Sequence, residues 1–273
     1  MTSFFFNTPN TARKLKNDPE SVSFVRSFFH IDPSNLTYID GDNGKKILKL
    51  EIATFTFNEN GQIVEQHGRA FEMEMDEARF QRALKKGFSY TDDFVINKPG
   101  AYQFRAVIRD AETGQMGSAG QFIQVPDLNK NRLALSGLVL GTMEAENQQN
   151  NQQNKTNDRD DIQPTPNVRR FSRDSVIDYG AVIYNPTKDP KTGKPQLSMQ
   201  LEFFRDGKSV LQLEPRVIEP NEGANNPKRV DCGGRLKLTG LPPGDYMMRI
   251  VVTDQLANKK YSRAEQWMDF SVR

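Results

Sequence analysis

The chain has 273 residues, of which 26% are charged, and its formal net charge at pH 7 is +2. This length suffices for two domains of ordinary size, each able to bury its own core. The balanced charge excludes the basic footprint of a nucleic-acid-binding protein, and the single cysteine excludes an intrachain disulfide.

The N-terminal segment, Met1 to Phe6, lacks the basic region and the long apolar stretch of a signal peptide. No run of about 18 apolar residues follows it, so we expect no transmembrane helix. The start is abrupt, and we therefore expect the chain to begin inside a longer precursor.

The segment Asp40 to Gly44, Asp-Gly-Asp-Asn-Gly, resembles the opening of a calcium-binding loop. It departs from the EF-hand pattern because Gly44 occupies the third ligand position and Lys45 stands where the glycine belongs. A loop between strands is the favoured interpretation, and we predict neither a metal nor another cofactor. The only histidines, His30 and His67, each lie in a strand-like run and are predicted to be structural or solvent-facing.

Two alternating apolar runs, Ile47 to Phe57 and Leu197 to Phe204, are each followed by a turn and a returning strand. The turns contain Asn-Gly in the first case and Asp-Gly in the second. These dipeptides between alternating runs are the strongest short signals of a β-hairpin.

One segment, Asp76 to Lys86, has the pattern of a short helix. Asp76 is suited to the N-cap, Phe80 and Leu84 fall on one face, and Gly87 is suited to end the helix. We predict one helix here, between the first hairpin and the segment described next.

A twelve-residue segment occurs twice, at Pro99 to Asp110 and at Pro243 to Asp254, with six identical positions. Both copies read Pro-Gly-x-Tyr-x-x-Arg-x-Val-x-x-Asp. The Pro-Gly turn and the alternation that follows it indicate a strand with one buried face. A tyrosine after such a turn is typical of the tyrosine corner of immunoglobulin-like sandwiches, where its hydroxyl bonds to backbone upstream. Each copy is followed by a further strand, at Gly120 to Val125 and at Gln266 to Val272.

The repeat predicts an all-β chain of two immunoglobulin- or fibronectin-III-like β-sandwich domains in tandem, with one short helix in the first. We place the first module at 1–142, a disordered Asn/Gln-rich linker at 143–168, and the second module at 169–273. The linker contains an unbroken run of eight Asn and Gln residues and has no apolar surface to offset ordering entropy. Before it, the apolar stretch Leu133 to Leu140 is compatible with either the last strand of the first module or an interdomain contact.

Two features are candidates for ligand contact. Arg169, Arg170 and Arg173 form a basic cluster, which usually marks a solvated strand edge and less often an anionic partner site. Trp267 is exposed if Met268 and Phe270 point inward, and it would then suit a carbohydrate or protein contact. Core or interdomain packing is the favoured interpretation of this tryptophan.

The sequence has no catalytic motif. It lacks a Gly-x-Ser-x-Gly elbow, a phosphate-binding loop and a Cys-x-x-Cys pair. Cys232 has no second cysteine to pair with, so a small buried or half-buried thiol is the favoured interpretation. We predict that the chain is not an enzyme.

The motifs together resemble the C-terminal region of bacterial von Willebrand factor A-related proteins of the acidobacterial type. The resemblance covers most of the chain from about Phe24 onward and rests on Lys98 to Asp110, Gly117 to Ala119, Leu133 to Gly137, Tyr179-Gly180, Phe204 to Gly207, Pro243 to Tyr246 and Gln266 to Phe270. It implies an exported protein, periplasmic or extracellular, with a von Willebrand A domain upstream. The A domain's Asp-x-Ser-x-Ser motif is absent here, so its metal-dependent ligand binding does not transfer.

The sequence thus favours a tandem β-sandwich acting as a spacer or a protein-interaction region. Its partner would be another protein or the upstream A domain. A carbohydrate-binding module that uses exposed aromatic residues is the alternative.

Overall fold

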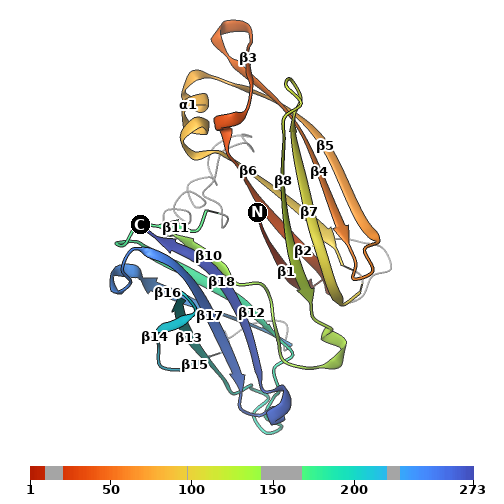
Figure 1. Ribbon diagram of the computed structural model, residues 1–273. Coiled ribbons are helices and arrows are strands. Elements are labelled where there is room, and N and C mark those ends of the chain that lie inside the picture. The colour runs from red at the N-terminus through yellow and green to blue at the C-terminus, as the bar shows by residue number, and fades with distance from the viewer. Residues whose placement is uncertain (10–20, 97, 143–167, 220–227) are drawn as a thin grey trace. The chain divides into compact units, whose positions relative to one another are not determined.

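A computed structural model describes residues 1–9, 21–96, 98–142, 168–219 and 228–273, and it consists mainly of β-strands (Figure 1). Two compact units are present. Among the described residues, the first comprises Met1–Phe5 and Val22–Val125, and the second comprises 126–142, Val168–Arg273 and the end of the first strand. The predicted linker lies outside the described residues, apart from Val168.

The first unit contains two antiparallel sheets. Sheet A has the strand order β1-β2-β6, made of β1 (Thr2–Pro9), β2 (Ser21–Ile31) and β6 (Phe88–Val95). Sheet B has the order β3-β4-β7-β8, with a fifth strand, β5, pairing with β4; its strands are β3 (Tyr38–Asp40), β4 (Lys46–Phe57), β5 (Ile63–Met75), β7 (Gly100–Asp110) and β8 (Met116–Val125).

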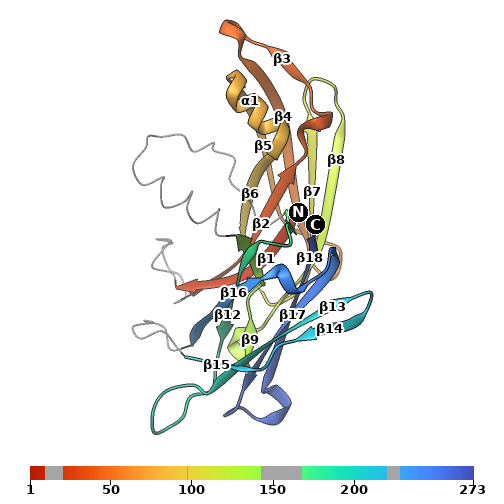
Figure 2. The same cartoon turned by 90° about the vertical axis from the view of Figure 1, so that its left-hand side faces the viewer.

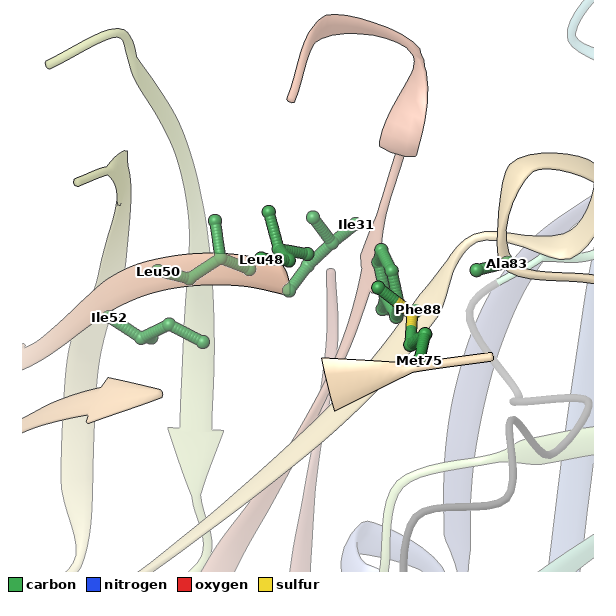
Figure 3. Close-up of a cluster of buried hydrophobic side chains, with 7 residues drawn as sticks. All are labelled: Ile31, Leu48, Leu50, Ile52, Met75, Ala83 and Phe88. Carbon is green, nitrogen blue, oxygen red and sulfur yellow. The ribbon is translucent and has the colours of Figure 1, made fainter. Parts of the chain in front are cut away.

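The core of the first unit joins both sheets to the helix α1 (Glu77–Lys86), which Figure 2 shows beside β4 and β5. Figure 3 draws one cluster of its buried side chains: Ile31 and Phe88 from sheet A, Leu48, Leu50, Ile52 and Met75 from sheet B, and Ala83 from the helix. Because neither sheet can bury its apolar face alone, the two form a β-sandwich around this cluster.

The helix has the predicted ends. The Asp76 carboxylate accepts a hydrogen bond from the Arg79 backbone N–H at 2.7 Å, and Gly87 ends the helix at a φ of 72°. The buried residue of the helix is Ala83, whereas Leu84 is 40% exposed. Phe80 packs edge-on against Tyr38, which centres the contact face between Phe80 and Ala83 and turns Leu84 toward solvent.

The second unit also contains two sheets. Sheet C has the order β10-β12-β16, with β9 beside β12; its strands are β9 (Ala134–Leu135), β10 (Val139–Thr142), β12 (Val176–Tyr184) and β16 (Arg229–Lys237). Sheet D has the order β11-β18-β17-β13-β14, with β15 beside β13; its strands are β11 (Arg170–Phe171), β13 (Leu197–Arg205), β14 (Lys208–Gln212), β15 (Arg216–Ile218), β17 (Gly244–Asp254) and β18 (Arg263–Val272). Short 3-10 turns occupy Pro33–Asn35, Asp42–Gly44, Leu128–Lys130, Leu238–Gly240 and Lys259–Tyr261.

The apolar stretch before the linker belongs to sheet C. Leu135 pairs with Ile183, and Val139 pairs with Gly180, so β9 and β10 follow one another along β12. The sequence predicts that the first module ends at residue 142, whereas β9 and β10 belong to the second unit. The change between units falls at Val125, because the strands after it satisfy their backbone groups on β12.

The duplicated segment forms β7 in one unit and β17 in the other, with the same register to its neighbours. On one side, Leu50 lies opposite Asp110 as Leu197 lies opposite Asp254. On the other side, Gly100 lies opposite Val125 as Gly244 lies opposite Val272. The predicted tandem repeat is therefore a repeat of three paired strands, β4-β7-β8 and β13-β17-β18.

Candidate functional site

The two motif tyrosines form the predicted corners. The Tyr102 hydroxyl donates to the Lys98 carbonyl at 2.7 Å, and the Tyr246 hydroxyl donates to the Pro242 carbonyl at 2.6 Å. Both rings are buried. The tyrosines therefore lock the start of each repeated strand and are not available as a ligand platform.

The last residue of the motif is a buried carboxylate that sequence reasoning left without a role. Asp110 accepts backbone N–H bonds from Glu112 and Thr113 in the following turn and from Thr37, 73 residues away in sequence. Burial acts to raise the pKa of Asp110, but these hydrogen bonds to the charged form outweigh it, so the pKa lies below its usual value.

Asp254 repeats this arrangement in the second unit. Its carboxylate accepts the Leu256 N–H at 3.0 Å and the Thr187 N–H at 2.7 Å. Each motif aspartate thus fixes a turn and ties it to a distant segment. The sequence feature that could have revealed this role is the recurrence of Asp at the same position in both copies of the motif.

The motif arginine lies on the outer face of each repeated sheet, stacked on an aromatic ring. The Arg105 guanidinium lies 5.3 Å from the Phe57 ring centroid, and the Arg249 guanidinium lies 5.5 Å from the Phe204 ring centroid. Phe57 and Phe204 occupy equivalent register positions, opposite Gln103 and Met247. Each unit therefore carries an arginine–phenylalanine pair on its solvent face.

In the second unit this pair extends into a larger cluster around Trp267. The indole ring centroid lies 5.1 Å from that of Phe204 and 5.1 Å from the Arg249 guanidinium. Trp267 and Met247 are 40% and 41% exposed. We call Phe204, Met247, Arg249 and Trp267 the Trp267 surface.

The strand register explains why Trp267 faces outward. Met268 lies opposite Met248 and Phe270 lies opposite Tyr246, and all four are buried. Their alternation leaves Trp267 on the solvent face, so core packing, one of the two interpretations favoured by the sequence, is wrong for this residue, and interdomain packing stays a prediction.

Acidic side chains surround the arginine of the Trp267 surface. Arg249 forms an ion pair with Glu202 and lies 3.6 Å from Glu265, whose carboxylate also accepts the indole N–H of Trp267 at 3.1 Å. The buried Nε of Arg249 has no hydrogen-bond partner within the described part of the chain. The surface therefore consists of two aromatic rings and Met247 around one arginine, whose positive charge is offset by Glu202 and Glu265.

The three candidate arginines do not converge on a site. The Arg169 guanidinium donates to the carbonyl and the carboxylate of Asp269, at 2.6 and 2.7 Å. Arg170 acts electrostatically on Asp245, and Arg173 donates to the Thr239 carbonyl at 3.4 Å. Arg170 lies on β11, an edge strand of sheet D, which agrees with a solvated strand edge.

A histidine–carboxylate group bridges the sheets of the first unit. The buried Asp92 carboxylate on β6 accepts the Thr54 hydroxyl at 2.7 Å and lies 3.1 Å from Nδ1 of His67. Nε2 of His67 lies 3.3 Å from the Glu65 carboxylate. Since the Thr54 hydroxyl donates to Asp92 and is itself buried, it is not activated by the histidine. The group serves as a polar tie between β4, β5 and β6.

The remaining candidates have structural surroundings. Asp40 to Gly44 forms the turn between β3 and β4, and the Asp40 carboxylate pairs with Lys46. Cys232 is buried as predicted, its thiol donates to the Ala181 carbonyl, and burial raises its pKa to about 12. Within the described ranges, no group of three or more His, Cys, Asp or Glu side chains is arranged to hold a metal ion. Those ranges also contain no helix long and apolar enough to cross a membrane.

Comparisons with known proteins give only remote likenesses. No protein-family model matches the chain, and no curated protein matches it. Among solved structures, a glycosyl hydrolase family 2 member from Bacteroides cellulosilyticus is 12% identical, with a TM-score of 0.32 over 92% of this chain. The BSP domain of a biofilm-associated protein is 13% identical, with a TM-score of 0.26 over 91% of this chain and 55% of that chain. This chain spans 28% of the length of the hydrolase chain.

Proposed function

We propose that the chain is a non-catalytic binding protein and that its Trp267 surface contacts another protein. One observation carries the proposal, namely that Trp, Arg, Phe and Met side chains gather on the solvent face of sheet D. Their exposed apolar surface contributes no hydrophobic free energy to folding. These residue types are enriched at protein interfaces, and Trp and Arg dominate interface hot spots.

The rigidity of the cluster supports the same function. The Trp267 ring is held by its N–H bond to Glu265 and by contacts with Phe204 and Arg249. An aromatic side chain that is already fixed loses little entropy on binding, so more of the contact energy appears as affinity. The two carboxylates of Glu202 and Glu265 outnumber the one positive charge of Arg249, which favours a partner with a basic group.

Site-specific photocrosslinking tests this proposal. A photoreactive amino acid replaces Met247, an exposed residue of the surface that lies opposite Phe204, in cells that naturally produce the protein. Val217 is the matched control, because it is 76% exposed and lies on β15 of the same sheet, away from Trp267. We expect a discrete protein adduct from position 247 that is lost with Trp267→Ala and is absent from position 217. Equal adducts from both positions would contradict the proposal.

Carbohydrate binding is the second candidate, favoured by the exposure of the Trp267 indole on an open sheet face. Against it, Arg249 stacks on that ring and competes with a sugar for it. A glycan array decides between them. A hit that disappears with Trp267→Ala would replace the protein partner with a glycan.

We further propose, on the resemblance described above, that the chain acts as a spacer beside an upstream von Willebrand A domain outside the cytoplasm. The complete open reading frame tests this part. An A domain encoded directly upstream would support the spacer function. A reading frame without an A domain would contradict it, and the function would then depend on binding by the two units themselves.

A further inference from the structure

The outer edge of sheet B in the first unit is exposed over residues 116–120 of β8, whereas the side chain of the next residue, Gln121, is hydrogen-bonded to the backbone of Ser3 on β1. β8 is 10 residues long, ends the strand order of sheet B, and contains no charged residue and no proline. Over the described ranges it pairs only with β7. Native proteins usually protect an edge strand with charges, proline or a covering segment, because its free N–H and C=O groups can pair with another chain.

The equivalent edge in the second unit carries a short added strand at its end, beside Ser271 and Val272. β18 corresponds to β8 in register, and Arg170 and Phe171 of β11 pair with it in parallel. Arg169 then fastens the added strand by donating to Asp269. The same edge of the repeated three strands thus accepts an added strand within this protein.

A pocket lies along the uncovered edge of β8. Its volume is about 320 Å³, and residues 116–119 of β8 line one side. The rest of the lining combines apolar side chains, among them Phe29, Ile31, Ala106 and Ile108, with Met1 and with polar side chains such as His30, Asp32 and Gln115. A strand added to β8 would direct alternate side chains inward, toward this pocket, so apolar residues suit those positions.

The outer face beside the same edge offers an unpaired cation. Arg105 is exposed, stacks on Phe57 and donates to the Gln103 amide at 3.0 Å. It has no carboxylate within ion-pair distance among the described residues, whereas the equivalent Arg249 is paired with Glu202.

Gly120 has no side chain that could separate the Arg105 guanidinium from the edge of the sheet. Gly120 lies directly opposite Arg105, at the position that Trp267 occupies opposite Arg249 in the second unit. A strand beyond β8 would place its residue about 10 Å from the Arg105 backbone, two strand spacings away. A long acidic side chain at that position can meet the arginine across Gly120.

We propose that β8 binds an extended segment of another protein as an added β-strand. Alternate residues of this segment are apolar and enter the pocket, and an acidic residue opposite Gly120 pairs with Arg105. The site lies in the first unit and is independent of the Trp267 surface, so either can fail without the other.

A synthetic peptide tests the proposal with the full chain. The probe is acetyl-Val-Thr-Val-Glu-Val-Thr-Val-amide, whose sequence is the same in both directions and therefore suits parallel and antiparallel pairing. Two further peptides carry Gln or Lys in place of Glu. Hydrogen exchange of the β8 amides, followed by mass spectrometry, reports strand addition, and calorimetry gives the affinities.

We expect saturating Glu peptide to slow exchange in residues 116–120 at least tenfold. The Gln peptide should bind about two- to fivefold more weakly, the range for an exposed ion pair. Arg105→Glu should reverse the preference toward the Lys peptide. Arg109→Gln, on the same strand and paired with Glu51, and Trp267→Ala should leave the preference unchanged.

Three results would overturn the proposal. The first is no slowing of β8 exchange at millimolar peptide. The second is a free chain in which the β8 amides are already as protected as those of β7, which is paired on both sides, because the edge is then covered by the chain itself. The third is a preference for the Glu peptide that survives Arg105→Glu. Thermal melting of each variant confirms that it is folded before it is compared.

Discussion

The buried carboxylate that ends each repeat gives the sharpest prediction for stability. Asp254 is 1% exposed and accepts one backbone N–H at each carboxylate oxygen, from Leu256 and Thr187. In Asp254→Asn the amide oxygen can keep one of these bonds, but its NH₂ group then faces the other N–H. The variant therefore loses one charge-assisted hydrogen bond and leaves a buried donor unsatisfied.

The expected cost is about 1–3 kcal/mol of unfolding free energy, the range for an unsatisfied buried polar group. Guanidinium unfolding followed by tryptophan fluorescence measures it, because the only tryptophan, Trp267, reports on the second unit. Asp206→Asn is the matched control in the same unit, since the Asp206 side chain is 92% exposed. It should change stability by less than about 0.5 kcal/mol. Equal midpoints for both variants would refute the anchoring role of Asp254.

Three further predictions follow from the same contacts. Asp110→Asn should destabilise the first unit at pH 7, and the loss of unfolding free energy should become smaller below about pH 4. The reason is that a carboxyl group with a lowered pKa contributes stability that is lost as the pH falls through that pKa. A pH-independent loss, measured by circular dichroism melts, would contradict this. Tyr246→Phe should cost about 1 kcal/mol through loss of the bond to the Pro242 carbonyl, measured by the same fluorescence unfolding, and an unchanged midpoint would speak against the corner. Cys232 should resist iodoacetamide in the folded chain at pH 8 and react after unfolding, because its thiol is buried and its pKa is raised to about 12; rapid labelling of the folded protein would show that the thiol is accessible.

The local features of the repeat were predictable from the sequence because short-range chemistry determines them. The Pro-Gly turn and the following alternation specify a strand with Tyr102 or Tyr246 facing inward. The cap at Asp76 and the stop at Gly87 likewise define the ends of the helix. None of these features depends on a partner distant in the chain.

The features that the sequence did not determine depend on strand register and on long-range pairing. Both alternations of β18 were chemically acceptable, and only the pairing of Met268 with Met248 places Trp267 outside. The stretch from Ala134 to Thr142 is apolar enough for either unit, and its assignment depends on the edge of β12. The contacts of Asp110 with Thr37 and of Asp254 with Thr187 could not be predicted either, because each joins residues that are far apart in the sequence.

The affinity of the crosslinked partner for purified full-length variants tests the proposed binding surface most directly. Trp267→Ala should weaken binding at least tenfold, as expected of a hot-spot tryptophan, while Val217→Ala should change it less than twofold. Equal affinities of the wild type and Trp267→Ala would contradict a binding role for the Trp267 surface.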